Sequence, residues 1–193
     1  MNRRTVNRFS ATACWLLAAQ IGSGQDLAIR LADPELRQLA VRSITYSGGR
    51  DLALLLSWGE NPPPRVDSLQ LRLGLMEAFR KLRAKEAIPF LIRYMTLDIR
   101  GISGNVWTKA DGVVETRLPA IDALIAIGPD ASKAVIAALS DKTPPEVYVE
   151  SLFIICKIAD PAARDFLLSV HPKNPTEAYY VRNGLELIQQ RHN

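Results

Sequence analysis

The chain has few of the residues that usually build catalytic or metal sites. Only two Cys and two His occur among its 193 residues. His171 is expected just after a helix and His192 is the penultimate residue, so the two lack the spacing of a ligand pair. A Gly-rich phosphate loop, a nucleophile elbow and an HExxH motif are also missing from the sequence. We therefore expect no catalytic residue, no metal site and no cofactor.

Cysteine is too scarce for a disulfide framework. Cys14 lies in the N-terminal segment, and Cys156 lies in the apolar run 153–156. If the N-terminal segment is removed, Cys156 has no partner within the chain. Its apolar neighbours predict a buried, unreactive thiol rather than a nucleophile.

The first 24 residues have the three parts of a secretory signal. Three Arg within the first eight residues precede an apolar run, 11–21, and small residues follow it before Gln25. This run is too short for a stable membrane-spanning helix. We predict a signal peptide over 1–24 and a periplasmic or secreted domain over 25–193, with no membrane span after processing. The alternative is an organelle transit peptide, which is also rich in Arg and poor in acidic residues.

Removal of this segment would change the charge of the protein. The full chain carries 24 Lys and Arg against 20 Asp and Glu, a net charge of +4. Residues 1–24 hold three Arg and no acidic residue, so the mature domain has 21 basic and 20 acidic residues, a net charge of +1. The sequence pI of about 9.2 therefore reflects mainly the N-terminal segment. A near-neutral exported domain is not expected to bind nucleic acid.

Apolar residues keep helical spacing through most of the mature domain, and the pattern returns as pairs of helices. The last apolar residue of each expected first helix is followed, 12 or 13 residues later, by the apolar residue that closes the second helix. These residues are Ile44 and Leu56, Leu82 and Met95, Ile127 and Leu139, and Ile158 and Val170. We predict an all-α domain of about four helix pairs, and such recurrence is typical of a repeat architecture.

Other positions mark where helices should begin and where the array should end. A capping residue stands directly before a Pro, and so predicts a helix start, at Asp33, Thr143, Asp160 and Asn174. A final helix over 177–190 is predicted to cap the array, with an apolar face inward and a polar face toward solvent. Its inner face comprises Tyr180, Val181, Gly184 and Ile188.

The segment Ala123–Val135, with the sequence ALIAIGPDASKAV, resembles the HEAT-repeat family, in particular its short bacterial form related to phycobilisome-lyase-type repeats. Residues 82–91 and 158–167 match less well and 33–58 match only by spacing, so the resemblance covers 33–170. It implies a right-handed α-solenoid of antiparallel helix pairs that serves as an interaction scaffold. The lyase-type relatives imply the alternative, a lyase-like or cofactor-handling enzyme, and fold similarity alone does not carry function.

One segment, 99–116, interrupts the repeat without helical spacing. It has Ser-Gly-Asn and Asp-Gly turn signals beside stretches of strand-like composition, which predicts a hairpin between the second and third helix pairs. Loops held on rigid scaffolds often carry binding residues. We therefore identify Trp107 as a candidate partner contact, with Arg100 and Lys109 as polar neighbours. The alternative is that Trp107 folds back to cover the helices.

The remaining candidates have simpler structural explanations. Five basic residues gather near the second helix pair without forming one stripe, so a solvated helix face is favoured over an anion site. They are Arg72, Arg80, Lys81, Arg83 and Lys85. Trp58 is expected to cover a helix end before the stiff Pro connector 62–64. The sequence thus favours an exported, non-catalytic scaffold that binds another protein or an envelope component.

Overall fold

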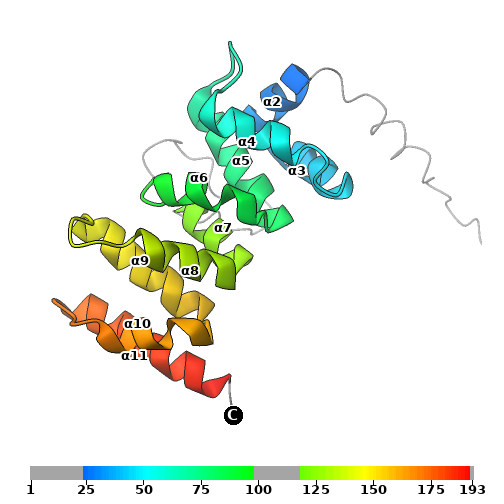
Figure 1. Cartoon of the computed structure of the whole chain (residues 1–193). Helices are drawn as coiled ribbons and strands as arrows, with labels where there is room; N and C mark the ends of the chain where they lie inside the picture. Colours follow the sequence, from blue (N-terminus) through cyan, green and yellow to red (C-terminus); the bar gives the residue numbers. More distant parts are fainter. Residues whose placement is uncertain (1–23, 98–117, 192–193) are drawn as a thin grey trace, which may run out of the picture. The chain divides into compact units, whose positions relative to one another are not determined.

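The computed structural model describes residues 24–97 and 118–191 of the chain. Over these residues it contains ten α-helices, α2 to α11, two short 3-10 helices and no strand (Figure 1). The prediction of an all-α protein is thereby confirmed for the part of the chain that is described. The chain divides into two compact units, residues 1–74 and 75–193, and the boundary falls inside helix α5 (Ser68–Leu82).

The N-terminal unit begins with three helices and ends in the first half of α5. The three are α2 (Gly24–Ala32), α3 (Arg37–Tyr46) and α4 (Leu52–Glu60). The core is mainly aliphatic and includes Leu27, Leu31, Val41, Ile44, Leu55, Trp58 and Leu71. Trp58 is buried within α4, and a Cβ added to Gly24 would lie 3.5 Å from its ring. The helix end that Trp58 covers is therefore the start of α2.

A buried arginine and a glycine join α2 to α5. Arg37 donates a hydrogen bond from Nε to the carbonyl oxygen of Leu31 at 3.1 Å, near the end of α2. Its Nη2 donates to the side-chain oxygen of Gln70 in α5 at 2.7 Å. Farther along α5, a Cβ on Gly74 would lie only 2.4 Å from the Leu31 carbonyl oxygen. Only glycine allows the two backbones to approach this closely.

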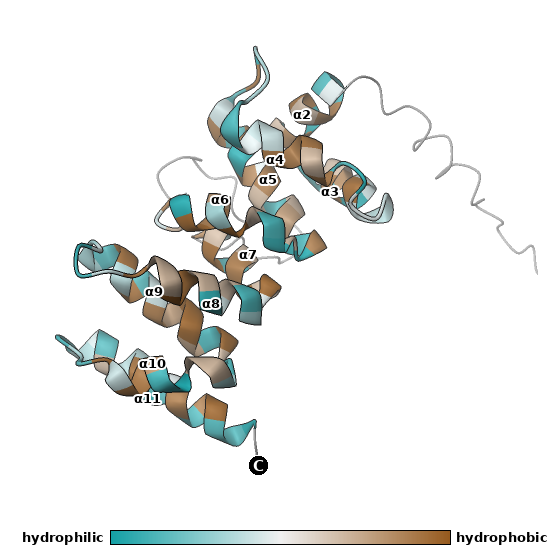
Figure 2. Cartoon of the chain, viewed as in Figure 1, coloured by the Kyte–Doolittle hydropathy of each residue, from teal (hydrophilic) through white to brown (hydrophobic). Residues whose placement is uncertain are grey.

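The C-terminal unit continues from the second half of α5 through two short 3-10 helices and six α-helices. They are η1 (Lys85–Ala87), α6 (Ile88–Arg93), α7 (Pro119–Ile127), α8 (Pro129–Ala138), α9 (Pro145–Ile158), η2 (Pro161–Ala163), α10 (Arg164–Ser169) and α11 (Pro175–Gln190). Hydrophobic residues make up much of α7 and α9 (Figure 2). The core draws on most of these helices and includes Phe79, Leu91, Met95, Ile121, Leu124, Leu152, Ile155 and Leu167.

Helices of this unit contact the next helix in the chain and, in several cases, also the one that follows it. The α7 helix contacts α8 and α9, and α9 contacts α11, while α6 contacts α8. The α9 and α11 helices run parallel, because two separate contacts join residues that are each 27 positions apart, Phe153 with Tyr180 and Cys156 with Asn183. The short α10 helix packs against α11 and lies between these two in the chain.

Most of the residues that define the sequence repeat fall at helix ends. The α5, α7 and α9 helices end at Leu82, Ile127 and Ile158, as the apolar pattern predicts. Leu139 and Val170 directly follow α8 and α10. The N-terminal pair departs from the prediction, since α3 continues to Tyr46 and α4 continues past Leu56 to Glu60. The α4 helix extends because Trp58, beyond the predicted end, still belongs to the core.

Two of the four predicted helix starts are confirmed by capping hydrogen bonds. The Asn174 side chain accepts from the Glu177 N–H at 2.9 Å at the start of α11. The Asp160 side chain accepts from the Ala162 N–H at 3.2 Å at the start of η2. In both cases Pro occupies the next position, where a missing N–H costs no helical bond.

The other two predicted starts are displaced. Asp33 accepts from the Glu35 N–H at 2.8 Å and so closes a turn, while α3 begins only at Arg37. Thr143 accepts from the Ser140 N–H at 2.9 Å and also closes a turn, before α9 begins at Pro145. A short side chain with an oxygen acceptor serves a turn as readily as a helix N-terminus, so the sequence pattern alone does not separate the two.

Candidate functional site

The three residues that the sequence suggested as partner contacts cannot be placed. Arg100, Trp107 and Lys109, and with them the whole predicted hairpin 99–116, lie outside the described residues. The predicted signal peptide lies outside them too, apart from Gly24. Both therefore stay predictions.

The charged and metal-binding candidates in the described part have ordinary surroundings. Lys81, Arg83 and Lys85 are exposed, as expected of solvated charges, whereas Arg72 and Arg80 are half-buried. Within residues 24–97 and 118–191, no group of three or more His, Cys, Asp or Glu could hold a metal ion. In the same residues no helix combines the length and the apolar character needed to span a bilayer.

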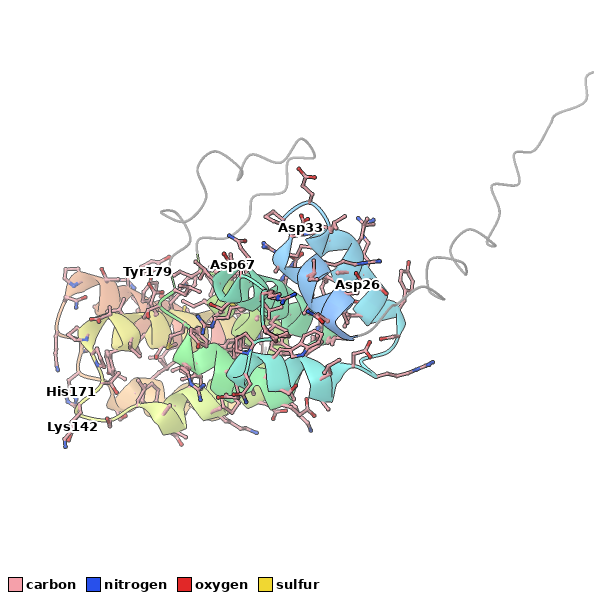
Figure 3. All side chains as sticks on the ribbon, turned by 90° about the horizontal axis from the view of Figure 1, so that it is seen from above. Asp26, Asp33, Asp67, Lys142, His171 and Tyr179 are labelled. Atoms are coloured by element: carbon pink, nitrogen blue, oxygen red, sulfur yellow. The ribbon has the colours of Figure 1, made fainter. Side chains whose placement is uncertain are left out.

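Aromatic side chains gather where α9 lies beside α11. The rings of Phe153 and Tyr180 have centroids 5.5 Å apart, and those of Tyr180 and Tyr179 are 5.6 Å apart. Phe153 and Tyr180 are half-buried, while Tyr179 is 53% exposed. We call Phe153, Lys157, Tyr179 and Tyr180 the aromatic face. Tyr179 lies on a different edge of the unit from His171 and Lys142, which belong to interhelical loops (Figure 3).

Charges of both signs border the aromatic rings. Lys157 Nζ lies 5.5 Å from the centroid of the Phe153 ring, within the range of a cation–π contact. On the same helix, Glu150, Phe153 and Lys157 are three and four residues apart and so share one side of α9. Burial raises the pKa of Tyr180 above its ordinary value of 10.0, and the negative charge of Glu150 raises it further. Tyr180 therefore keeps its proton and can donate a hydrogen bond at neutral pH.

The helices beneath the aromatic face are held in close contact. A Cβ added to Gly184 of α11 would lie 3.3 Å from the Cα of Cys156 and 3.0 Å from Leu167. Beside it, Asn183 Nδ2 donates a hydrogen bond to Cys156 Sγ at 3.3 Å. One turn past the end of α11's apolar face, Arg191 Nη1 donates to the carbonyl oxygen of Ile158 at 2.6 Å. These contacts fix α11 against α9 along most of its length.

The predictions for α11 and for Cys156 agree with this arrangement. Gly184 and Ile188 are buried and Tyr180 and Val181 are half-buried, on the side that was predicted to face inward. Cys156 is a free, buried thiol, as its apolar neighbours indicated. Burial raises its pKa above 9.0, against the lowering effects of the Asn183 hydrogen bond and the Lys157 charge.

One buried acid at the start of α11 was missed by the sequence analysis. Glu177 is only 4% exposed, and its carboxylate accepts from the Lys173 N–H at 2.8 Å and from Asn174 Nδ2 at 2.7 Å. Together with the bond that Asn174 accepts, this forms a reciprocal capping arrangement. The signal was present in the sequence as Asn174 followed three residues later by Glu. Burial, and then the charge of Glu177, raise the pKa of Tyr148.

A second exposed surface lies on α3 in the N-terminal unit. Leu36 just before the helix and Leu39 and Tyr46 within it are 40%, 62% and 91% exposed. We call these three residues the α3 ridge. Leu39 and Tyr46 lie on the opposite side of α3 from the buried residues Val41 and Ile44. The ridge was not predicted, because helical spacing alone does not show which side of a helix faces solvent.

Comparison with known protein families, with curated proteins and with solved structures found no match to this chain in any of the three.

Proposed function

We propose that this chain is an exported, HEAT-like helical-repeat protein that binds another protein or an envelope component and carries out no catalysis. The observation that carries the proposal is the aromatic face on α9 and α11, where three rings and a lysine meet on two tightly joined parallel helices. The export part rests on the signal-like pattern of residues 1–24.

The HEAT-like part rests on how the C-terminal unit repeats. Helix ends at Leu82, Ile127 and Ile158 follow the sequence repeat, and α7, α9 and α11 contact one another in succession. Such stacking of successive first helices is the arrangement that a solenoid requires. We propose the right-handed superhelix on the same grounds and on the resemblance of 123–135 to that family.

The chemistry of the aromatic face suits a protein partner. Tyr and Phe present large rigid surfaces at low entropic cost, and they are enriched among residues that dominate binding energy. Tyr179 offers an exposed ring, and the protonated hydroxyl of Tyr180 offers a hydrogen-bond donor. Gly184, Asn183 and Arg191 already fix the two helices, so binding would cost little reorganisation.

The hairpin predicted over 99–116 is a second proposed contact region. Trp107 would serve as its anchor, with Arg100 and Lys109 as polar neighbours. Replacing 101–116 by a short Gly-Ser linker should preserve the helical circular dichroism signal and weaken partner capture. Loss of the fold together with unchanged capture would show instead that the segment covers the helices.

Site-specific photo-cross-linking tests the aromatic face directly. A photoreactive side chain at Tyr179 should capture a defined partner from the native envelope fraction, and the same side chain at Leu168 should not. Leu168 is the matched control because it is 56% exposed on α10 of the same unit, against 53% for Tyr179. Equal capture from both positions, or none from Tyr179, would overturn the role of the aromatic face.

Export has a separate test. Intact-mass analysis of the protein purified from its host should give a mature N-terminus near Gln25, in an extracytoplasmic fraction. Retention of Met1, or a purely cytosolic pool, would remove the signal-peptide proposal. Cleavage at that point would leave α2 complete except for Gly24, its first residue.

A further inference from the structure

The bond at which we expect the signal segment to be removed lies within helix α2. It joins Gly24 and Gln25, the first two residues of that helix. Both residues are exposed, so access alone does not protect the bond. Their backbone is nevertheless held in place, since a Cβ on Gly24 would lie 3.5 Å from the Trp58 ring of α4. On the other side of the bond, Asp26 forms an ion pair with Arg30, one helical turn later, at 2.9 Å.

Opening α2 at this bond disturbs the core of the N-terminal unit. Leu27, only two residues beyond Gln25, is 4% exposed, and Ala28 and Leu31 are fully buried. The far end of the helix is held as well, because Arg37 donates a hydrogen bond to the Leu31 carbonyl oxygen at 3.1 Å. A protease cuts a packed helix only where the helix has opened locally. The extended segment that enters a protease at this bond therefore draws Leu27 away from its core contacts.

We propose that the folding of α2 closes this bond to proteolysis, so that the signal segment is removed while the chain is still unfolded. This rests on the export part of the proposed function. It also gives the order of events, because a chain that folds before it is processed keeps residues 1–23. A chain exported in the folded state would arrive with the bond already closed. The protein therefore crosses the membrane unfolded, is cleaved, and only then packs α2 against α4 and α5.

The core residues of α2 all follow the bond, so the processed chain can still form the helix. Leu27, Ala28 and Leu31 remain after cleavage, and so does the close approach of Gly74 to the Leu31 carbonyl oxygen. Asp26 stays in the first turn, where a negative charge stabilises the N-terminal end of a helix. Processing after Gly24 thus removes no buried side chain of the described residues, and α2 can pack once the signal segment has gone.

Limited proteolysis of the full chain tests the protection of α2 directly. An endoproteinase that cuts before Asp has a site at Gln25–Asp26, one residue beyond the predicted bond, and another at Ser140–Asp141, in the exposed loop between α8 and α9. Each rate is divided by its value in the urea-unfolded chain. In the folded wild type the first bond should be cut at least about tenfold more slowly than the second, since only the first requires a helix to open. Equal rates would overturn the proposal.

A matched pair of variants assigns the protection to the packing of α2. Leu31→Ala removes a fully buried side chain from α2 and should speed the cut at Gln25–Asp26 at least about tenfold. Leu124→Ala truncates a fully buried leucine of the other unit and should leave that rate unchanged. Leu31→Val is a milder change that should give an intermediate rate, and it replaces Leu31→Ala if the latter does not fold. A rate that neither Leu31 variant raises would overturn the proposal.

Signal peptidase separates this proposal from the proposed function. When the full chain is diluted from urea directly into micelles that hold the enzyme, it should be processed near Gln25 at least about tenfold faster than the refolded chain. Equal processing of the two samples would overturn the order of events and leave the export proposal standing. Processing of neither sample would refute the export proposal and, with it, the order of events.

Discussion

The two units of this protein are built from the same kind of helix and hold together in different ways. In the N-terminal unit, α2 and α5 meet through a buried Arg37 and a backbone contact at Gly74. In the C-terminal unit the helices meet through a continuous apolar core, and polar groups act mainly at helix ends. Both units have an apolar core, and the N-terminal unit adds to its core a buried arginine and a closer backbone approach.

The units also differ in what they leave exposed. Among the described residues, the N-terminal unit exposes five large hydrophobic side chains: Ile29, Leu36, Leu39, Tyr46 and Leu54. The larger C-terminal unit exposes two, Leu168 and Tyr179. The N-terminal unit therefore has more exposed apolar surface that another molecule could cover. Of the two exposed residues in the C-terminal unit, Tyr179 belongs to the aromatic face, where we propose that a partner binds.

The largest expected effect concerns the apolar core of the C-terminal unit. Leu124 is fully buried in α7, so Leu124→Ala should leave a cavity and lower the free energy of unfolding by about 2–5 kcal/mol. Hydrogen exchange should accelerate most in α7, α8 and α9, which contact one another, and least in α2 and α3. Equal acceleration in both units would contradict the idea that each has its own core. Ile127, at the end of the same helix, is only half-buried and should tolerate alanine better.

A pair of glycine variants sharpens the comparison. Gly74→Ala puts a methyl group where the nearest atom is the Leu31 carbonyl oxygen at 2.4 Å, and backbone cannot move aside cheaply. We expect a loss of about 1–3 kcal/mol, as for other overpacked sites. Gly184→Ala meets the flexible end of Leu167 at 3.0 Å and the Cα of Cys156 at 3.3 Å, a milder overlap than at Gly74, and alanine gains about 1 kcal/mol in helix propensity. Its unfolding midpoint should therefore stay near that of the wild type, and a larger loss for Gly184 than for Gly74 would reverse the contrast.

The sequence predicted the parts of the fold that depend on periodicity. Apolar residues recurring at helical spacing located the ends of α5, α7 and α9, because a helix that packs on a core must present one apolar side at regular intervals. The same spacing placed Gly184 and Ile188 on the inner face of α11. The Asn174 cap was found because Asn before Pro satisfies a free N–H at little cost.

Features that depend on which side of a helix faces water were not predicted. Leu39 and Tyr46 have the same spacing as core residues, and only the position of the neighbouring helices shows that they are exposed. Arg37 was not recognised as buried, since arginine usually lies at the surface and its partners in α2 and α5 are distant in sequence. The aromatic face brings Phe153 and Tyr180 together across 27 residues, a contact that helical periodicity within one segment does not encode.

A smaller effect is expected at the N-terminus of α11. Asn174→Ala removes the acceptor for the Glu177 N–H and the donor to the Glu177 carboxylate, so the free energy of unfolding should fall by about 1 kcal/mol. The matched control is Asp33→Ala in the N-terminal unit, where the side chain closes a turn and the helix begins only four residues later. Chemical denaturation of both variants makes the comparison. A loss for Asp33→Ala equal to that for Asn174→Ala would show that the turn matters as much as the cap.

The smallest expected effect is a dependence on alkaline pH that arises in the C-terminal unit. Burial raises the pKa of Tyr148, Cys156 and Tyr180 in the folded state, from ordinary values of 10.0, 9.0 and 10.0. As the pH rises above about 9, the unfolded chain therefore loses these protons before the folded chain does, and the free energy of unfolding falls. Their contribution is complete below pH 9 and is lost as the pH passes through the raised values.

Tyr180→Phe should flatten the decline in the urea midpoint above pH 10, because it keeps the ring and removes the titrating hydroxyl. Tyr46→Phe, at a position 91% exposed in the N-terminal unit, should leave the decline unchanged. Equal slopes for wild type and Tyr180→Phe would show that burial at the aromatic face does not control the titration.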